Sequence, residues 1–285
     1  MMQTLESVSA SPRSEPGAEA GAFYRRALGA LSNAGVPHLI GGALALAHHT
    51  GIRRYTKDLD IFVRPEDAEW ALATIATAGY RAEMVAPHWL GKAHYGDAFI
   101  DVIFSSGNGV CVVDDHWFKH ADLGRVLGLP VLLSPVEEMI WSKAFVLERE
   151  RFDGADVTHL IRACGRKLDW ERLYRRFDPH WQVFFAHLML FRFSYPSERD
   201  VIPTWVMRAL GERTKEEVAT PPPEERICRG TLLSARQYLV DVEHWGFADG
   251  RLDPEVQMNE ADIAQLTQEV RNKEKDARTE VGGRR

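Results

Sequence analysis

The stretch that decides the fold is LIGGALA at residues 39–45, followed after a short gap by TKDLDIFV at residues 56–63. The first stretch is an apolar run that ends in two glycines, a pattern typical of a strand that turns directly into a helix. The second is a strand pattern with aspartates at alternate positions. Because alternate residues of a strand share a face, Asp58 and Asp60 are expected to project the same way.

Helical and extended patterns alternate around these two stretches. We expect helices at residues 23–34, 43–49 and 65–78, and strands at residues 37–40, 58–63, 81–85, 92–95 and 99–104. The fold class predicted for this half of the chain is α/β (α+β), with a small mixed sheet flanked by helices.

From residue 134 onward the patterns are helical. A capping box formed by Ser134 and Glu137, with Pro135 at the first helical position, predicts a helix that passes through Lys143. Asp153 is expected to cap a further helix in the same way. The second half is therefore predicted to be a helical domain.

Two more helices are expected beyond this point. Asp169 can cap one of them, and the Asp178-Pro179 pair breaks the chain before an apolar helix at residues 181–193. Composition then divides the chain into a flexible N-terminal segment at 1–19, an α/β domain at 20–133, a helical domain at 134–253 and a polar, mobile tail at 254–285. Within the tail, helical spacing of apolar residues is compatible with a helix at residues 260–273.

The composition is that of an ordinary folded protein, because 45% of the 285 residues are hydrophobic and 27% are charged. The formal net charge of -6 argues against a surface that grips nucleic acid as a whole, although it leaves room for a local basic groove. Cys111, Cys164 and Cys228 lack a CxxC pair, which disfavours a disulfide framework and a structural zinc site. With no secretory signal in the first 20 residues, these features predict a cytoplasmic protein.

Asp58 and Asp60 form a candidate metal site. Like charges this close repel each other unless a cation compensates them, and hard oxygen ligands suit Mg²⁺ or Mn²⁺. A third acid, Asp101, lies in the apolar run FIDVIF at residues 99–104. Because an isolated carboxylate in such a strand is unfavourable when buried without a partner, we expect Asp101 to join the same site.

Three acids on adjacent strands can hold two ions about 4 Å apart, one polarising a triphosphate and the other lowering the pKa of an attacking hydroxyl. This arrangement is typical of phosphoryl or nucleotidyl transfer. Gly41 and Gly42, at a strand-to-helix turn, let the backbone approach a triphosphate, and the N–H groups that open the next helix favour anions. The two glycines are therefore expected to bind a nucleotide.

The order of these features resembles the polymerase-beta-like nucleotidyltransferase superfamily: a hydrophobic-Gly-Gly stretch, then Asp-x-Asp, then a later strand Asp, over about residues 37–104. The run GGALALA at residues 41–47, an Arg-x-x-Thr approach to the Asp pair and a downstream helix with a lysine look most like minimal nucleotidyltransferases related to abortive-infection toxins. The resemblance makes residues 20–133 the nucleotidyltransferase-like catalytic domain.

The resemblance also implies roles for residues outside the acid cluster. Lys57 and Lys143 are expected to bind the nucleotide, Lys143 through its phosphates. The run RERFDGAD at residues 149–156 takes the place of a charged motif near the active site, with Arg151, Asp153 and Asp156 as the matching residues.

This sequence departs from the family pattern at two places. The gap from Gly42 to Asp58 is slightly long, and the arginine and aspartate spacing in the run at residues 149–156 does not align cleanly. Individual roles are therefore not assigned to the arginines Arg53, Arg54, Arg149 and Arg151.

The function implied is a metal-dependent transfer of NMP from an NTP to a hydroxyl acceptor with release of pyrophosphate. Asp58, Asp60 and Asp101 would be both catalytic residues and ligands of Mg²⁺ or Mn²⁺. The acceptor is either RNA, such as a tRNA end, or a small hydroxylated molecule, and the net acidity favours the small molecule. An antitoxin-like protein partner is compatible with the toxin-related resemblance.

Each feature also has a plain structural interpretation. Asp101 can be an edge-strand charge that discourages aggregation, Lys143 a solvated helix residue, and Asp153 and Asp156 acids that stabilise a helix start. The rival function is a catalytically silent nucleotide-binding or regulatory interaction protein of a toxin-antitoxin-like pair. Such a protein would bind NTP without releasing pyrophosphate.

Overall fold

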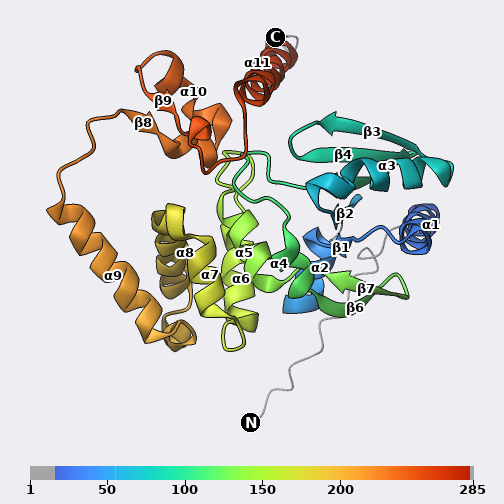
Figure 1. Cartoon of the computed structure of the whole chain (residues 1–285), viewed down its shortest axis with the longest axis horizontal. Helices are drawn as coiled ribbons and strands as arrows, with labels where there is room; N and C mark the ends of the chain where they lie inside the picture. The colour runs from blue at the N-terminus through green and yellow to red at the C-terminus, as the bar shows by residue number, and fades with distance from the viewer. Residues whose placement is uncertain (1–16, 55, 283–285) are drawn as a thin grey trace.

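The computed structural model describes residues 17–54 and 56–282. Its main feature is a seven-stranded mixed sheet with the order β3-β4-β5-β2-β1-β7-β6 (Figure 1). The strands are β1 (Leu39–Ile40), β2 (Asp58–Phe62), β3 (Arg81–Ala86), β4 (Leu90–Tyr95), β5 (Ala98–Ile103), β6 (Asp122–Val126) and β7 (Leu129–Leu133). The β1–β7 and β2–β5 pairs are parallel, and the other neighbours are antiparallel.

Helices cover the sheet and continue into the second half of the chain. They are α1 (Ala18–Ala34), α2 (Gly42–Thr50), α3 (Ala68–Thr77), α4 (Asp115–Lys119), α5 (Val136–Ala144), α6 (Gly154–Cys164), α7 (Trp170–Arg176), α8 (Trp181–Ser194), α9 (Thr204–Ala219), α10 (Ala235–Glu243) and α11 (Glu260–Gly282). Figure 1 shows α5 to α9 gathered beside the sheet, opposite the side where α1 and α3 lie. A two-stranded sheet of β8 (Ile227–Cys228) and β9 (Ala248–Asp249) lies near α10.

The predicted fold class is confirmed: a mixed sheet with flanking helices is followed by a helical region. The helices and strands predicted before residue 105 are all present, with ends shifted by a few residues. The segment predicted to be helical within the tail lies inside α11. The division of the chain into four segments stays a prediction, as does the mobility of its two ends.

The hairpin of β6 and β7 was not predicted from the sequence. Pro130 lies inside β7, and a proline within an apolar run argues against a central strand because it cannot donate to the ladder. The structure tolerates Pro130 because β7 pairs with β1 only at Leu133, at the far end of the strand. Leu127 and Gly128, both at positive φ, make the turn between the two strands.

The predicted capping box at the start of α5 is wrong. Ser134 is fully buried, and its hydroxyl has no hydrogen-bond partner among the described residues. The backbone N–H of Ser134 instead donates to the carbonyl of Ile40, which continues the sheet pairing up to the helix. Glu137 does not reach back to the helix start, because its carboxylate accepts from Arg172 and from the backbone N–H of Asp169.

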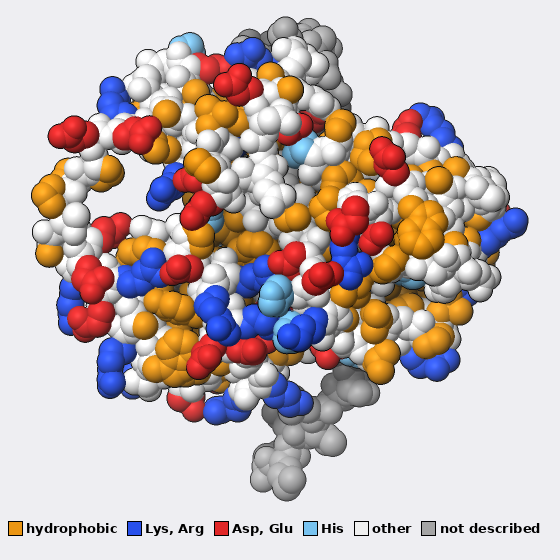
Figure 2. Space-filling view, in the orientation of Figure 1, with side chains coloured by type: hydrophobic (Ala, Val, Ile, Leu, Met, Phe, Trp, Pro, Cys, Tyr) orange, Lys and Arg blue, Asp and Glu red, His pale blue; other side chains and the backbone are white. Residues whose placement is uncertain are grey.

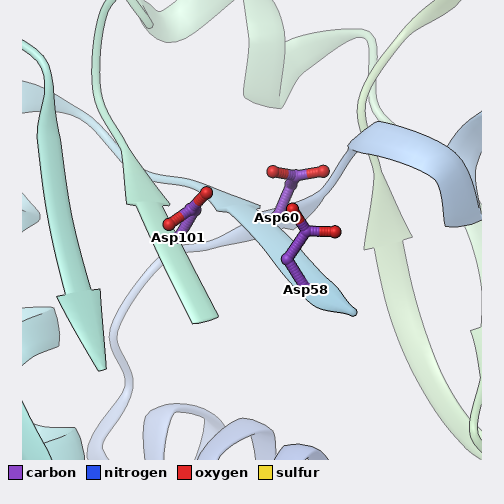
Figure 3. Close-up of side chains that lie close together, drawn as sticks. All are labelled: Asp58, Asp60 and Asp101. Carbon is purple, nitrogen blue, oxygen red and sulfur yellow. The ribbon is translucent and has the colours of Figure 1, made fainter. Parts of the chain in front are cut away.

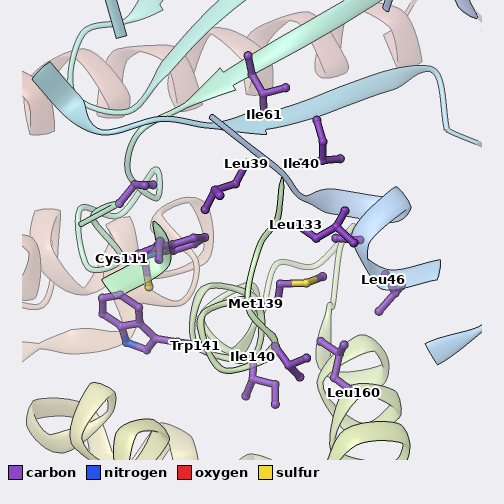
Figure 4. Packing of buried hydrophobic residues seen from close by; sticks show 14 of the residues in the cluster. Leu39, Ile40, Leu46, Ile61, Cys111, Leu133, Met139, Ile140, Trp141 and Leu160 are labelled. Atoms are coloured by element: carbon purple, nitrogen blue, oxygen red, sulfur yellow. The ribbon is translucent and has the colours of Figure 1, made fainter. Parts of the chain in front are cut away.

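One continuous hydrophobic cluster joins the sheet to the helices. Leu39 and Ile61 contribute from the strands, while Met139, Ile140 and Trp141 contribute from α5 (Figure 4). α5 is therefore anchored in the core along its length, and the residues at its C-terminal end have a fixed position relative to β2.

No described helix combines the length and the apolar character that a membrane crossing requires. The face of the molecule in Figure 2 carries Lys and Arg side chains interspersed with Asp and Glu rather than a field of one sign.

Candidate active site

Three carboxylates meet on one face of the sheet. Asp58 and Asp60 alternate along β2, and the parallel register places Asp101 of β5 directly opposite Asp60. Carboxylate oxygens of the three residues all lie within 4.8 Å of one another, and the three side chains converge in Figure 3. We call these three residues the triad. The structure thus brings together the acids that the sequence predicted to be neighbours.

The interpretation of Asp101 as an edge-strand charge is wrong. β5 lies inside the sheet, with β4 on one side and β2 on the other. Its alternation explains the placement, because Ile100 and Val102 are fully buried whereas Asp101 points to the opposite face.

The glycine turn is shaped by its close approach to β2. Gly42 has φ +54, and a Cβ added there would lie 1.6 Å from an Asp60 carboxylate oxygen. A Cβ added to Gly41 would lie 2.1 Å from the Phe62 ring. Both positions therefore require glycine for local packing, independently of any nucleotide. Nucleotide binding by Gly41 and Gly42 stays a prediction.

The same turn opens α2 without a side-chain cap. Gly41 is the N-cap residue and offers no side chain to bind the N–H groups of the first turn. Uncapped N–H groups at the start of a helix favour an anion. α2 therefore presents an anion-binding end beside Asp60.

The electrostatics of the triad favour a cation. Burial, together with the neighbouring charges of Asp58 and Asp101, raises the pKa of Asp60 to about 7, although Lys143 and Arg151 act in the opposite direction. Burial also raises the pKa of Asp101, against the effect of the Lys92 ammonium beside it. A cation placed between the carboxylates would favour their charged forms and offset these shifts.

Lys143 lies in a network of opposite charges close to the triad. Its Nζ lies 2.9 Å from a carboxylate oxygen of Asp153 and 2.9 Å from one of Asp156. Arg151 also binds Asp153, and Arg54 binds Asp156 at 2.6 Å. The interpretation of Lys143 as a solvated helix residue is wrong, because its side chain is only 15% exposed.

The predicted cap at the start of α6 is also wrong in its chemistry. Asp153 occupies the N-cap position, but its carboxylate makes no capping hydrogen bond. It binds Lys143 and Arg151 instead, because two cations reach the carboxylate at once. The cap predicted at Asp169 is confirmed, since its side chain accepts from the backbone N–H of Arg172.

The other basic residues considered from the sequence are placed as follows. Lys57 is exposed, and its backbone carbonyl accepts a hydrogen bond from the Tyr24 hydroxyl. No ion pair between the Lys57 ammonium and an acid occurs within the described part of the chain. Arg53 and Arg149 are likewise exposed. A nucleotide-binding role for Lys57 stays a prediction.

Lys92 of β4 is a site residue that the sequence did not identify. Its Nζ lies 2.5 Å from Asp101 Oδ1, and the antiparallel register of β4 and β5 places the two residues opposite each other. The available signal was a lysine in an extended segment shortly before the Asp101 strand. Its meaning depends on hairpin register, which the sequence leaves open.

The donor set of the triad suits a hard divalent cation. It consists of carboxylate oxygens that are half-buried and close together. The Asp60 carboxylate makes no hydrogen bond or ion pair with a described residue. Mg²⁺ and Mn²⁺ prefer such ligands. Across residues 17–54 and 56–272, whose side chains the structure describes, this is the single group of three or more acids, histidines or cysteines close enough to share an ion.

Comparisons with known proteins add structural resemblances. No family model matches the chain, and no curated protein matches it either. The antibiotic-resistance factor ANT(2'')-Ia is 20% identical, with 59% of this chain and 96% of that chain covered and a TM-score of 0.41. The lincosamide antibiotic adenylyltransferase LnuA is 15% identical, covering 50% of this chain and 95% of that chain at a TM-score of 0.34.

An antigenic nucleotidyltransferase-like protein from Paracoccidioides brasiliensis is 12% identical, covering 65% of this chain and 92% of that chain at a TM-score of 0.41. Because the identities are at most 20% and the TM-scores at most 0.41, the function of this chain is inferred from its own residues.

Proposed function

We propose that this protein is a nucleotidyltransferase that moves NMP from an NTP to a hydroxyl acceptor and releases pyrophosphate. The observation that supports this most strongly is the triad itself. Three carboxylates converge beside the uncapped start of α2, so a site for a divalent cation adjoins a site for an anion. A nucleoside triphosphate with its bound ion requires both.

The residues of the chain divide the work in this proposal. Gly41 and Gly42 let the phosphate groups approach the backbone, and the first N–H groups of α2 bind them. Lys143 and Arg151, which already lower the pKa of Asp60, are the cations proposed to stabilise the added phosphate charge. Asp101, at the β4 side of the triad, is the residue proposed to accept the proton of the attacking hydroxyl.

Asp58, Asp60 and Asp101 would hold Mg²⁺ or Mn²⁺. A bound divalent ion would supply Lewis-acid stabilisation of the charge that develops on the phosphate oxygens.

The acceptor proposed first is a small hydroxylated molecule rather than RNA. The chain has a formal net charge of -6, and the face in Figure 2 mixes both signs. A surface that holds RNA by its phosphates needs a basic field and binds in a salt-dependent way.

The described cysteines are free thiols, in keeping with a protein that works in the cytoplasm, where NTPs are available.

The test supplies each α-labelled NTP with Mg²⁺ or Mn²⁺ and two separate acceptor pools, one of small hydroxylated compounds and one of small RNA. Wild type is compared with the Asp58→Ala/Asp60→Ala double variant. We expect label to move to the small-molecule pool in the wild type alone. Label on RNA would show that the protein is a nucleotidyltransferase whose acceptor is RNA. NTP binding that requires the triad but releases no pyrophosphate would support the catalytically silent alternative.

A further inference from the structure

Lys92 is the cation in direct contact with the triad. Its Nζ lies 2.5 Å from Asp101 Oδ1 and 4.2 Å from the centre of the Phe99 ring. Phe99 and Asp101 are alternate residues of β5, so both lie on the triad face. The ammonium group is therefore held by one strand through a carboxylate and an aromatic ring.

The lysine has no competing acid partner among the described residues. Glu83 of β3 is opposite Lys92 in the sheet, but its carboxylate is turned to Arg81 and His94. Arg81 binds Glu83 at 2.8 Å and 3.1 Å, and His94 lies 3.3 Å from it. Lys92 is thus committed to Asp101, with a side chain that is 25% exposed.

This contact has two consequences for a divalent ion at the triad. Lys92 occupies Oδ1 of Asp101, so the second oxygen of that carboxylate is the one left to face an ion. The ammonium would also place a positive charge beside a bound ion, and the two positive charges would repel each other. One effect orients a ligand, and the other weakens ion binding.

We propose that Lys92 is a positioning residue of the triad, which fixes Asp101 in a single orientation toward the ion and limits how tightly the ion is held. The inference rests on the proposed function, because it presupposes that the triad binds a divalent ion. It concerns a residue that acts through Asp101 and not on the substrate.

Opposite changes in two readouts follow from this role. Removing the charge in Lys92→Met is expected to tighten Mn²⁺ binding about tenfold, since a unit positive charge disappears from beside the ion. Freeing the carboxylate is expected to broaden the electron paramagnetic resonance spectrum of bound Mn²⁺, because Asp101 then adopts several orientations. A lysine that only supports the fold would weaken Mn²⁺ binding when replaced.

The experiment titrates the full chain with Mn²⁺ in the absence of nucleotide and follows free and bound Mn²⁺ by electron paramagnetic resonance. Wild type is compared with Lys92→Met and Lys92→Arg, where the arginine is expected to restore both readouts to near wild type. Arg81→Met is the matched control, because it removes a cation of the neighbouring strand that binds Glu83 instead of the triad. Circular dichroism checks folding, and Lys92→Gln replaces any variant that fails to fold.

Unchanged or weaker Mn²⁺ binding in Lys92→Met and Lys92→Gln would overturn the inference while leaving the proposed function intact. An unaltered bound-Mn²⁺ spectrum would overturn it in the same way. If wild type binds no Mn²⁺, or binds it independently of Asp58 and Asp60, the proposed function and the inference fall together.

Discussion

Two groups of acids in this molecule are compensated very differently. Glu137 and Glu138 of α5 are 7% and 0% exposed, and arginines of α7 bind both of them. Arg172 lies 2.5 Å from each glutamate, and Arg176 lies 3.3 Å from Glu138. The two buried glutamates thus meet two arginines, of which Arg176 also binds Asp114 at 2.7 Å.

The triad is less compensated, because one described cation contacts its three acids. Lys92 binds Asp101, and the Thr56 hydroxyl donates to Asp58. Asp60, whose pKa is raised to about 7 by burial and by the neighbouring acids, has neither a side-chain hydrogen bond nor an ion pair to a described residue. The fold places arginines beside one acid pair and leaves the triad with less positive charge, and we propose that the triad binds a cation from solution. On this proposal the glutamates of α5 are structural acids and the triad is functional.

The largest effect is expected when the triad loses one charge. Asp60→Asn keeps the shape of the side chain but removes a negative charge, and we expect nucleotidyl transfer to fall about 10³-fold. The free energy of unfolding without metal should stay level or rise, because repulsion within the triad is relieved. Label transfer and urea unfolding measure the two quantities. Asp67→Asn, outside the triad, is the control, and transfer within tenfold of wild type would contradict the assignment.

The opposite pattern is expected from the compensated pair. Arg172→Met leaves Glu137 without its arginine and weakens the binding of Glu138, so the free energy of unfolding should fall by about 3–5 kcal/mol. Transfer by the remaining folded protein should be unchanged. Urea unfolding checks the first result and transfer at low temperature the second. Arg213→Met, which breaks an exposed pair with Asp178, should lower stability by at most about 1 kcal/mol.

A smaller effect tests the contact between the glycine turn and the triad. Gly42→Ala is expected to lower the free energy of unfolding by about 1–3 kcal/mol and also to reduce transfer, because the methyl group displaces Asp60. Gly79→Ala is the matched control, since Gly79 also has positive φ but faces open space. The free energy of unfolding of Gly79→Ala should fall through backbone strain alone, and its nucleotidyl transfer should be unchanged. Equal loss of transfer in both variants would show that the Asp60 contact is irrelevant.

The core of the site could be predicted from the sequence because it depends on local periodicity. Alternation in a strand places Asp58 and Asp60 on one face, and an acid between apolar residues marks Asp101. These signals need no knowledge of distant partners. The parallel pairing of β2 with β5 then brings the three residues together.

Features that depend on which segments and side chains meet in space could not be predicted. The role of Lys92 follows from the register of the β4–β5 hairpin. The capping box at Ser134 is locally reasonable, but sheet pairing with Ile40 decides the outcome. The position of Asp153 in the sequence predicts a helix cap, whereas in the structure its carboxylate binds Lys143 and Arg151. In the last two cases a partner that the helix pattern does not specify outweighs the capping preference.

We propose that the triad carries the transfer of a nucleotidyl group, and an NTP labelled at two positions shows whether it does. Wild type and Asp60→Asn are incubated in parallel with α-labelled and γ-labelled NTP, a divalent ion and the acceptor. In the wild type we expect the α label to move to the acceptor and the γ label to leave as pyrophosphate. In Asp60→Asn we expect neither transfer to the acceptor nor release of pyrophosphate. Movement of the γ label to the acceptor, or transfer that survives in Asp60→Asn, would contradict it.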